Sequence, residues 1–253
     1  MKVVSFNLRC HWKSNDGINA FIHRAGFIYE KINQEQPDVI AFQEVKRHSR
    51  DLLEKMLPEY EFVGTFRDAD YTGEGLYTAI RKDLYVFLGV EMFWLSPTPF
   101  VAGSRFKNQS PCPRICLVTK IRNKNTNEVF RMINLHLDHV SDEARMLGLD
   151  CIFKFLDKYE ELEHIPMVML GDFNALPTDN VMQTCAERSG WIDTTKDVSV
   201  TFHDFGRKQF KIDYILVTED WKDRIEKAET WTDCHEGIYL SDHYPVCLYV
   251  KNK

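Results

Sequence analysis

The feature that most restricts the fold of this chain is a series of short apolar segments, each followed directly by polar residues. Residues 2–8, 38–42 and 165–170 are rich in Val, Ile, Leu and Phe, which is typical of buried strands. Strands of one sheet can end at the same edge, so we expect the polar residues behind them to gather in one cleft. These residues are Asn7, Gln43, Glu44, Asp172 and Asn174.

Helix-like and strand-like segments alternate along the rest of the chain. Apolar residues at helical spacing predict helices over 19–35 and 48–57, and a third helix begins after Ser141, a good N-cap. Further strands are expected over residues 60–66, 76–82, 84–94, 114–122, 128–137, 211–217, 225–231 and 245–251, with a long irregular segment at 96–113. The mixture indicates an α+β protein with more strand than a simple βαβ fold contains.

Length and composition suit an ordinary globular protein. A chain of 253 residues fits a single domain over 1–253, although two small domains would also fit. Apolar residues make up 44% and charged residues 28%, enough for a core and a solvated surface. With 32 basic and 38 acidic side chains the formal charge is −6. Non-specific duplex binding needs a broad basic face, so we favour a small phosphorylated substrate or a short single strand.

The cysteines and the N-terminus suggest an intracellular protein. Seven cysteines occur at wide spacings without a CxxC pair, so we expect free thiols in a reducing compartment. The N-terminus enters a strand pattern without an apolar leader, and no apolar run is long enough for a membrane span. We therefore predict a cytoplasmic protein with no membrane span and no obligate protein partner, and a secreted mature form is the alternative.

The polar residues near the strand ends share one chemistry. Asn134 and His136 close the return strand of a predicted hairpin, Asp213 lies in a later strand, and Asp242-His243 precedes the last one. Carboxylates, amides and histidines suit the hard cations Mg²⁺ and Mn²⁺. There is no HExxH, glycine-rich phosphate loop or GxSxG motif, so three other hydrolase mechanisms lack support. Each residue alone has an ordinary structural explanation, and the prediction depends on the whole set.

Six motifs occur in a fixed order, and together they resemble one known family. They are Ser5-Phe6-Asn7, Phe42-Gln43-Glu44, Asn134-Leu135-His136-Leu137-Asp138-His139, Gly171-Asp172-Phe173-Asn174, Ile212-Asp213-Tyr214-Ile215 and Ser241-Asp242-His243-Tyr244-Pro245. Over almost the whole chain they resemble the endonuclease/exonuclease/phosphatase superfamily, which includes pancreatic deoxyribonuclease, abasic-site endonucleases, inositol polyphosphate phosphatases and deadenylases. The resemblance implies a DNase I-like fold, a four-layer αββα sandwich of two mixed β-sheets.

The resemblance also implies a metal site and a phosphate site. Glu44 corresponds to the direct ligand of a Mg²⁺ or Mn²⁺ ion, Asn7 to its neighbour, and Asp242 to a second carboxylate near the metal. Arg114, which opens a strand after a proline-rich segment, resembles a phosphate-binding arginine. The residues expected to contact the substrate phosphate are Arg114, Asn174 and His136.

The implied catalytic residues divide the chemistry among them. Asp172 and Asn174 correspond to the pair that orients the attacking water and the phosphate. His243 corresponds to the histidine that faces the scissile phosphate, and Asp213 to the carboxylate that fixes its tautomer. His136 corresponds to the histidine that stabilises phosphorane charge or protonates the leaving oxygen. Either Asp172 or the His243–Asp213 pair can take the proton of the water, and the sequence leaves this choice open.

Two departures from the abasic-site endonuclease pattern, and one further motif, indicate which branch of the superfamily this chain resembles. Abasic-site endonucleases have an acidic residue where this chain has Arg9 and a tyrosine where it has His136, which argues against that branch. The segment 93–99 followed by Arg114 resembles bacterial members of unassigned substrate, nearer to the deadenylase-like branch. Substrate identity is expected to lie in loops 9–17, 67–75 and 96–113. Aromatic residues of these loops could stack on a base or sugar, or cover the sandwich edge, namely Trp12, Tyr71, Phe100 and Phe106.

The first functional prediction is a Mg²⁺-dependent phosphodiesterase that uses metal-assisted in-line attack of water, such as a 3′–5′ exonuclease on single-stranded RNA. The alternative is a phosphomonoesterase acting on a sugar or inositol phosphate. A catalytically inactive binding module of the same fold is disfavoured, because no position of the six motifs is missing. The expected partner is a phosphoester substrate, which is single-stranded nucleic acid under the first prediction.

Overall fold

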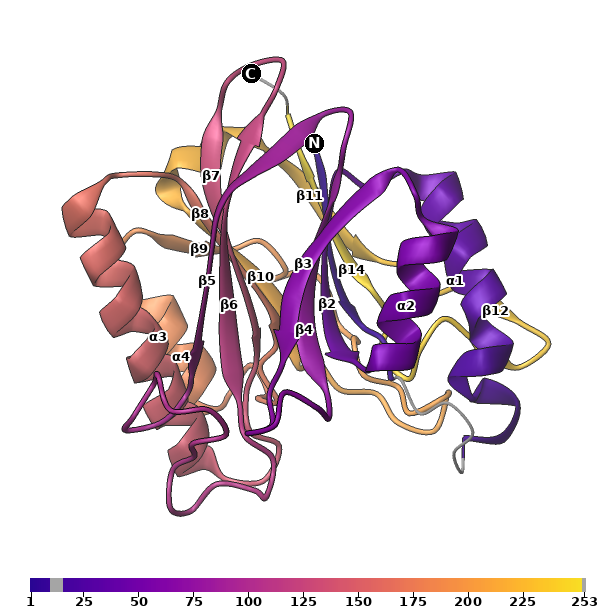
Figure 1. Cartoon of the computed structure of the whole chain (residues 1–253), viewed down its shortest axis with the longest axis horizontal. Helices are drawn as coiled ribbons and strands as arrows, with labels where there is room; N and C mark the ends of the chain where they lie inside the picture. Colours follow the sequence, from indigo (N-terminus) through magenta and orange to yellow (C-terminus); the bar gives the residue numbers. More distant parts are fainter. Residues whose placement is uncertain (10–15, 252–253) are drawn as a thin grey trace.

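Two six-stranded β-sheets lie face to face between two layers of helices in the computed structural model of the chain (Figure 1). The structure describes residues 1–9 and 16–251. Each sheet combines antiparallel strand pairs with one parallel pair, β1 with β2 in the first sheet and β7 with β8 in the second. The predicted four-layer αββα sandwich of two mixed sheets is therefore confirmed.

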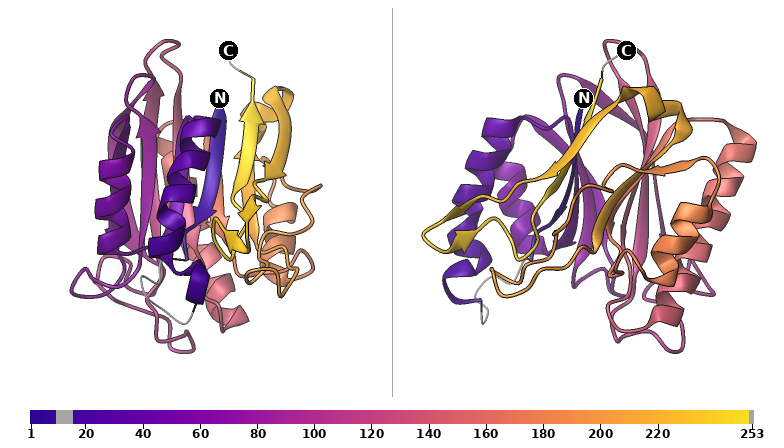
Figure 2. Two further views of the ribbon diagram at one scale, coloured as in Figure 1. Left: turned by 90° about the vertical axis from the view of Figure 1, so that its right-hand side faces the viewer. Right: turned by 180° about the vertical axis from the view of Figure 1, so that it is seen from behind.

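The first sheet has the strand order β11-β14-β1-β2-β4-β3. Its strands are β1 (Lys2–Asn7), β2 (Val39–Val45), β3 (Tyr60–Phe66), β4 (Gly75–Arg81), β11 (Ile225–Thr230) and β14 (Val246–Val250). Helices α1 (Phe21–Glu35) and α2 (Arg47–Met56) cover its outer face (Figure 1). Because β14 pairs antiparallel with β1, the two termini lie at the same edge of the molecule (Figure 2).

The second sheet has the strand order β5-β6-β7-β8-β10-β9. Its strands are β5 (Tyr85–Trp94), β6 (Ile115–Asn123), β7 (Val129–His136), β8 (Met167–Asp172), β9 (Trp191–Asp193) and β10 (Asp213–Thr218). Helices α3 (Asp142–Leu162) and α4 (Asn180–Glu187) cover its outer face, on the flank opposite α1 and α2 (Figure 2). Ser141 caps α3 as expected, since its side chain accepts a hydrogen bond from the backbone N–H of Ala144.

Some short elements were not predicted. They are helix α4, strands β9, β12 (Cys234–His235) and β13 (Ile238–Tyr239), and the 3₁₀ turns η1 (Gly17–Asn19) and η2 (Glu219–Arg224). The expected helix 19–35 accordingly begins at Phe21, after η1. Pieces this short carry too few residues for a hydrophobic period to emerge. They follow from packing against the two sheets.

Alternating side chains give the sandwich a middle layer between its sheets. Val3, Val39, Val168 and Ile215 belong to one buried apolar cluster made by both sheets. Successive side chains of a strand point to opposite faces, so the intervening residues pack toward the helices in two further clusters. The middle layer is apolar at the end of the sheets where the chain termini lie.

At the other end of the strands the same alternation delivers polar side chains to the middle layer. Residues an even number of positions away from the apolar ones in a strand share their face. These residues are Asn7 and Gln43 from the first sheet, and Asn134, His136, Asp172 and Asp213 from the second. The change from apolar to polar along one face is thus what places a cleft at the carboxyl ends of β1, β2, β7 and β8.

Gly171 lies on β8, and its surroundings leave no room for a side chain. Its φ is +143°, and a Cβ there would lie 2.0 Å from the carbonyl oxygen of Leu135 on β7. We expect Gly171→Ala to destabilise the protein by about 3 kcal/mol through backbone strain and steric overlap. Urea denaturation measures the change. As a control, Gly26→Ala in α1 meets open space and should stabilise by about 0.5–1 kcal/mol; equal effects would contradict this account.

Two other features bear on the sequence predictions. Among the described residues, no helix combines the length and apolar character needed to cross a bilayer. All six cysteines in that part of the chain are free thiols, as expected. Cys10 and Trp12 lie outside the described residues.

Candidate active site

Three strands of the second sheet bring a row of polar side chains together. His136 on β7 is paired in register with Asp172 on β8, and Asp172 is paired with Asp213 on β10. From the opposite sheet, Asn7 donates hydrogen bonds to Asp172 Oδ2 at 3.1 Å and to Glu44 Oε1 at 3.3 Å. Asn7 therefore joins carboxylates of the two sheets across the cleft.

A bulge explains why Glu44 reaches the cleft. Gln43 already faces the middle layer, so simple alternation would turn Glu44 toward the helices. Instead the register of β2 with β4 shifts between Phe42 and Val45, and Glu44 has φ +54°. A bulge of this kind redirects a side chain. Gln43 is fully buried and donates to Asn134 Oδ1 at 2.9 Å, so it ties the sheets together beneath the site.

The turn after β8 fixes the predicted Asp172–Asn174 pair. The backbone N–H of Asn174 donates to Asp172 Oδ1 at 2.9 Å, and Asn174 adopts the left-handed φ of +50° that asparagine tolerates. Its amide group donates to the carbonyl of Leu137 at 3.0 Å. Asp172 Oδ1 is therefore held by the turn, while Oδ2 faces the cleft.

His243 is a buried cation in this arrangement. Its Nδ1 lies 2.8 Å from Asp213 Oδ2, which leaves Nε2 directed toward Asp172 Oδ2 at 3.8 Å. Burial alone would lower the pKa of His243, but the carboxylates of Asp213, Asp172 and Asp242 outweigh it and raise the pKa to about 10. Thr201 supports the pair, since its Oγ1 accepts the backbone N–H of Asp213 at 3.0 Å.

His136 has the opposite character. Burial, followed by the positive charges of Arg114 and Arg67, holds its pKa well below the usual value. Its Nε2 lies 3.5 Å from Asp172 Oδ2. Asp172 thus has a neutral histidine on one side and a charged one on the other, a separation of protonation states suited to acid–base chemistry.

The carboxylates of the cleft carry more negative charge than the described residues neutralise. Glu44 is half-buried, and burial together with Glu74 and Asp242 raises its pKa to about 7. Burial and the neighbouring Asp213 raise the pKa of Asp172 to about 7 as well. Buried carboxylates whose ionised form is disfavoured in this way fit a divalent cation, which would relieve their repulsion.

More than one group of side chains offers ligand atoms for a cation. Asp172, Asp213 and His243 have candidate atoms within 4.8 Å of one another. The Asp213–His243 hydrogen bond already occupies one atom of each partner, however. In the part of the chain that the structure describes, the one hydrogen bond to the Glu44 carboxylate comes from the amide of Asn7. The Glu44 side is therefore the better place for an oxygen-ligated ion.

Arg9 contributes a contact that sequence reasoning did not foresee. Its Nε lies 3.5 Å from Asp242 Oδ2 and 3.3 Å from Asp16 Oδ2. Asp242 also accepts a hydrogen bond from the hydroxyl of Ser241 at 3.2 Å. Asp242 is thereby brought to the same cleft and held by a basic residue from the end of β1. The one feature of the sequence that could have indicated this contact is the basic residue Arg9 at a position where abasic-site endonucleases have an acidic one.

A recess beside the cleft contains the predicted phosphate-binding residue Arg114. The recess is lined by Glu44, Arg67, Glu74, Gly75, Leu76, Arg114, Ile115 and His136. Arg114 is 4% exposed, and its Nη2 is within 2.8 Å of His139 Nδ1. Arg67 and Glu74 from the β3–β4 turn were not predicted, because nothing in the sequence distinguishes them from other charged turn residues.

The loop aromatics divide between two locations. Tyr71 packs edge to face against Trp94, with ring centroids 6.0 Å apart. Phe100 and Phe106 line a separate hollow of about 440 Å³ against α3. Of the two alternatives for the loop aromatics, the location of Phe100 and Phe106 favours covering the sandwich edge over stacking on a base or sugar in the cleft.

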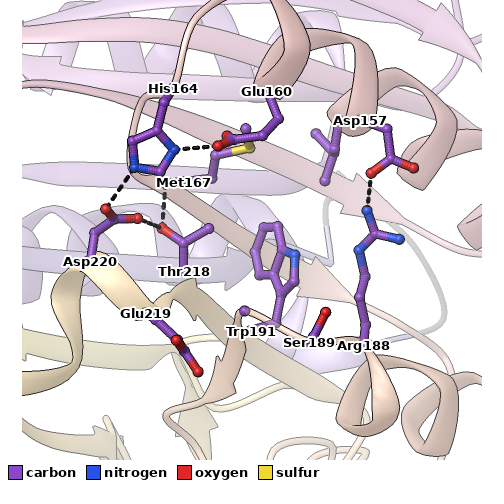
Figure 3. A pocket seen from close by; sticks show the side chains of 12 residues that line it. Asp157, Glu160, His164, Met167, Arg188, Ser189, Trp191, Thr218, Glu219 and Asp220 are labelled. Atoms are coloured by element: carbon purple, nitrogen blue, oxygen red, sulfur yellow. Dashed lines mark hydrogen bonds and ion pairs between the residues drawn. The ribbon is translucent and has the colours of Figure 1, made fainter.

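A larger hollow of about 620 Å³ lies at the amino end of β8, away from the predicted site (Figure 3). Most of its charged side chains contact one another. His164 lies between Glu160 and Asp220, and Arg188 pairs with Asp157. None of the predicted site residues lines it. Size alone thus does not mark the chemistry in this molecule.

Comparisons with known proteins agree with this fold. The family model for the endonuclease/exonuclease/phosphatase family matches residues 4–243. The solved structure of an endonuclease/exonuclease/phosphatase from Bacteroides vulgatus is 30% identical, with a TM-score of 0.90 over 100% of this chain and 98% of the other. No curated protein matches the sequence.

Two more distant structures share the fold. The mannosyl-6-phosphatase of Bacteroides thetaiotaomicron is 24% identical, with a TM-score of 0.88 over 100% of both chains. D. rerio TDP2, solved with a single-strand DNA product, is 16% identical, with a TM-score of 0.75 over 100% of this chain and 99% of the other. The chain belongs to the endonuclease/exonuclease/phosphatase family, a family of divalent-metal-dependent hydrolases that act on phosphoester bonds.

Proposed function

We propose that this protein uses a Mg²⁺ or Mn²⁺ ion to hydrolyse a phosphoester by in-line attack of water in the cleft between the two sheets. The observation that carries the proposal is Asp172, which contacts Asn7 and lies between His136 and His243. A water oriented there has a proton acceptor on one side and cationic or hydrogen-bonding groups for the phosphate on the other.

The donor set fits a hard divalent ion. Glu44 would be its direct protein ligand, with Asn7 and Asp242 beside it. When bound, the ion neutralises phosphoryl charge and lowers the pKa of a coordinated water. The raised pKa values of Glu44 and Asp172, caused by burial and by neighbouring carboxylates, support this assignment.

The two histidines suggest how the protons move. The oxygen of water forms a bond to phosphorus while the bond to the ester oxygen breaks, and Asp172 takes the proton from the water. His243, kept protonated by Asp213, can give a proton to the leaving alkoxide. His136 stays neutral and can donate a hydrogen bond to a phosphoryl oxygen, while Asn174 orients Asp172. Atoms and protons balance, since one water is consumed and an alcohol and a phosphate are released.

Both predicted substrate classes use this chemistry. A phosphodiester of single-stranded nucleic acid and a phosphomonoester of a small metabolite differ in how many oxygens of the phosphate are free. The net charge of −6 and the name of the mannosyl-6-phosphatase neighbour support a small phosphorylated sugar.

Removal of the metal should abolish turnover. After dialysis against EDTA, we expect hydrolysis of p-nitrophenyl phosphate or its bis ester to fall at least about 10²-fold, because the charge of the phosphate is no longer neutralised. Adding Mg²⁺ or Mn²⁺ should restore it, whereas Ca²⁺ is larger and suits a different geometry. Full activity after thorough chelation would refute the proposed role of the ion.

A further inference from the structure

Arg114 presents unused hydrogen-bond donors to the recess beside the active site. Its Nε and Nη1 are buried and have no hydrogen-bond partner among the described residues. The carboxylate of Asp138 is 3.8 Å from Nε, too far for a hydrogen bond. Buried donors without an acceptor are costly, so these N–H groups indicate that an acceptor binds there.

Arg67, which lines the same recess, supplies a further unused donor. Its Nη2 forms an ion pair with Glu74 Oε2 at 2.7 Å, but its buried Nε has no hydrogen-bond partner within residues 1–9 and 16–251. The indole N–H of Trp94 donates to the carbonyl oxygen of Arg67 at 2.7 Å. Backbone and guanidinium are both fixed, so the Nε–H direction is set before any ligand binds.

The recess between these arginines is small. Its free volume is about 10 Å³, which is room for about one water-sized atom. Leu76 and Ile115 contribute aliphatic side chains to its lining, and Glu44 and His136 of the active site line the same recess. It can therefore accept a single oxygen atom of a group bound in the cleft, but not a carbon chain.

The number of free oxygens separates the two substrate classes. A phosphodiester has two non-bridging oxygens, both needed by the metal and the histidines. A phosphomonoester has a third and carries a second negative charge. Two guanidinium groups that donate to one oxygen match that additional charge. A diester would have to place an ester substituent in the small recess.

We propose that Arg67, with Arg114, binds the third non-bridging oxygen of a terminal phosphate and so makes this site selective for phosphomonoesters. The inference rests on the proposed phosphoester hydrolysis and names its substrate class. Arg67 is the specificity-determining residue, and Glu74 positions it. Burial and the nearby charge of Arg67 also lower the pKa of Arg114, as expected for two cations that share an anion site.

The test compares two substrates and one product in a double variant. Arg67→Gln/Glu74→Gln removes the ion pair as a unit, so no unpaired Glu74 carboxylate remains. We expect kcat/KM for p-nitrophenyl phosphate to fall about 100-fold and that for bis-p-nitrophenyl phosphate to fall less than about threefold, because only the monoester loses bound oxygen contacts. The Kd of inorganic phosphate, measured by calorimetry with Mg²⁺ present, should rise at least about tenfold.

Two more variants keep the result interpretable. Arg81→Gln/Asp83→Asn removes a comparable ion pair, with atoms 2.6 Å apart, from the far end of β4 and should change none of these quantities. Arg67→Lys keeps a charge for Glu74 but loses the forked guanidinium. If the double variant does not fold, Arg67→Lys tests the role of Arg67 on its own. This variant should lose monoester activity and phosphate affinity while its melting temperature stays unchanged.

The outcomes separate this inference from the proposed function. Equal losses on both esters, or an unchanged phosphate Kd, would overturn the role of Arg67. A wild-type enzyme that prefers the diester would also overturn it, while leaving metal-dependent hydrolysis intact. A wild-type protein that hydrolyses neither ester with Mg²⁺ would instead sink the proposed function, and phosphate calorimetry would still report on Arg67.

Discussion

Replacing His243 with alanine is expected to lower kcat by about 10²–10⁴-fold, the range for loss of a positioned proton donor. His243 is 5% exposed, and its Nδ1 is held 2.8 Å from Asp213 Oδ2, so the ring has one orientation. Its Nε2 is on the side of Asp172. The variant removes both the proton for the leaving group and a positive charge beside the phosphate. Steady-state release of phosphate from a sugar phosphate with Mg²⁺ measures the loss, because an alkoxide leaving group needs a proton whereas p-nitrophenolate leaves without one.

Two companion variants show whether the effect belongs to the proton. Asp213→Asn retains the His243 ring but removes the carboxylate that raises its pKa, so the basic limb of the pH–rate profile should move to lower pH. His164→Ala, at an exposed histidine paired with Glu160 and Asp220, should leave kcat within about twofold. A His243→Ala enzyme with wild-type turnover would remove this residue from the mechanism.

Glu44→Gln is expected to reduce turnover at least about 10²-fold through loss of the charged metal ligand. The same variant should make the metal-free protein more stable at pH 8. The pKa of Glu44 is raised from its usual 4.5 to about 7 by burial and neighbouring carboxylates. A carboxyl group that holds its proton more tightly when folded favours folding at low pH, and this contribution is lost as pH rises from about 4.5 to about 7.

The sign of the stability change is therefore specific to pH. At pH 8 the melting temperature of metal-free Glu44→Gln should exceed that of the wild type by at least about 2 °C, and at pH 4 the two should be alike. Mg²⁺ should raise the melting temperature of the wild type but not that of the variant. Glu163→Gln, at an exposed glutamate paired with Lys120, serves as the control. A less stable Glu44→Gln at pH 8 would contradict the excess of buried negative charge.

Sequence periodicity predicted the strands and the α+β mixture, whereas the resemblance to the family implied the four-layer sandwich. The apolar side chains of β1, β2 and β8 point alternately toward the middle layer and toward the helices. The polar residues at the ends of these strands continue the same alternation. Asn7, His136, Asp172 and Asp213 therefore reach one cleft by register alone. Their proximity could be anticipated, while their chemical roles remain predictions.

Other site features could not be predicted from periodicity. Glu44 reaches the cleft only through a bulge and a positive φ, and alternation by itself would have placed it on the other face. Arg67 and Glu74 meet because a turn closes between β3 and β4, a tertiary event with no periodic signal. Helix α4 is only one or two turns long and is formed by packing. Local chain geometry, rather than pattern, decides these positions.

The most direct test of a metal site on the Glu44 side of the cleft is a crystal soaked with Mn²⁺ and inorganic phosphate. Anomalous scattering should place Mn²⁺ in contact with Glu44 and beside Asn7 and Asp242. The phosphate should lie among His136, His243 and Arg114, with one oxygen in the recess formed by Arg67. A Mn²⁺ ion bound only elsewhere, for example near His164, or a phosphate absent from this cleft, would contradict the account.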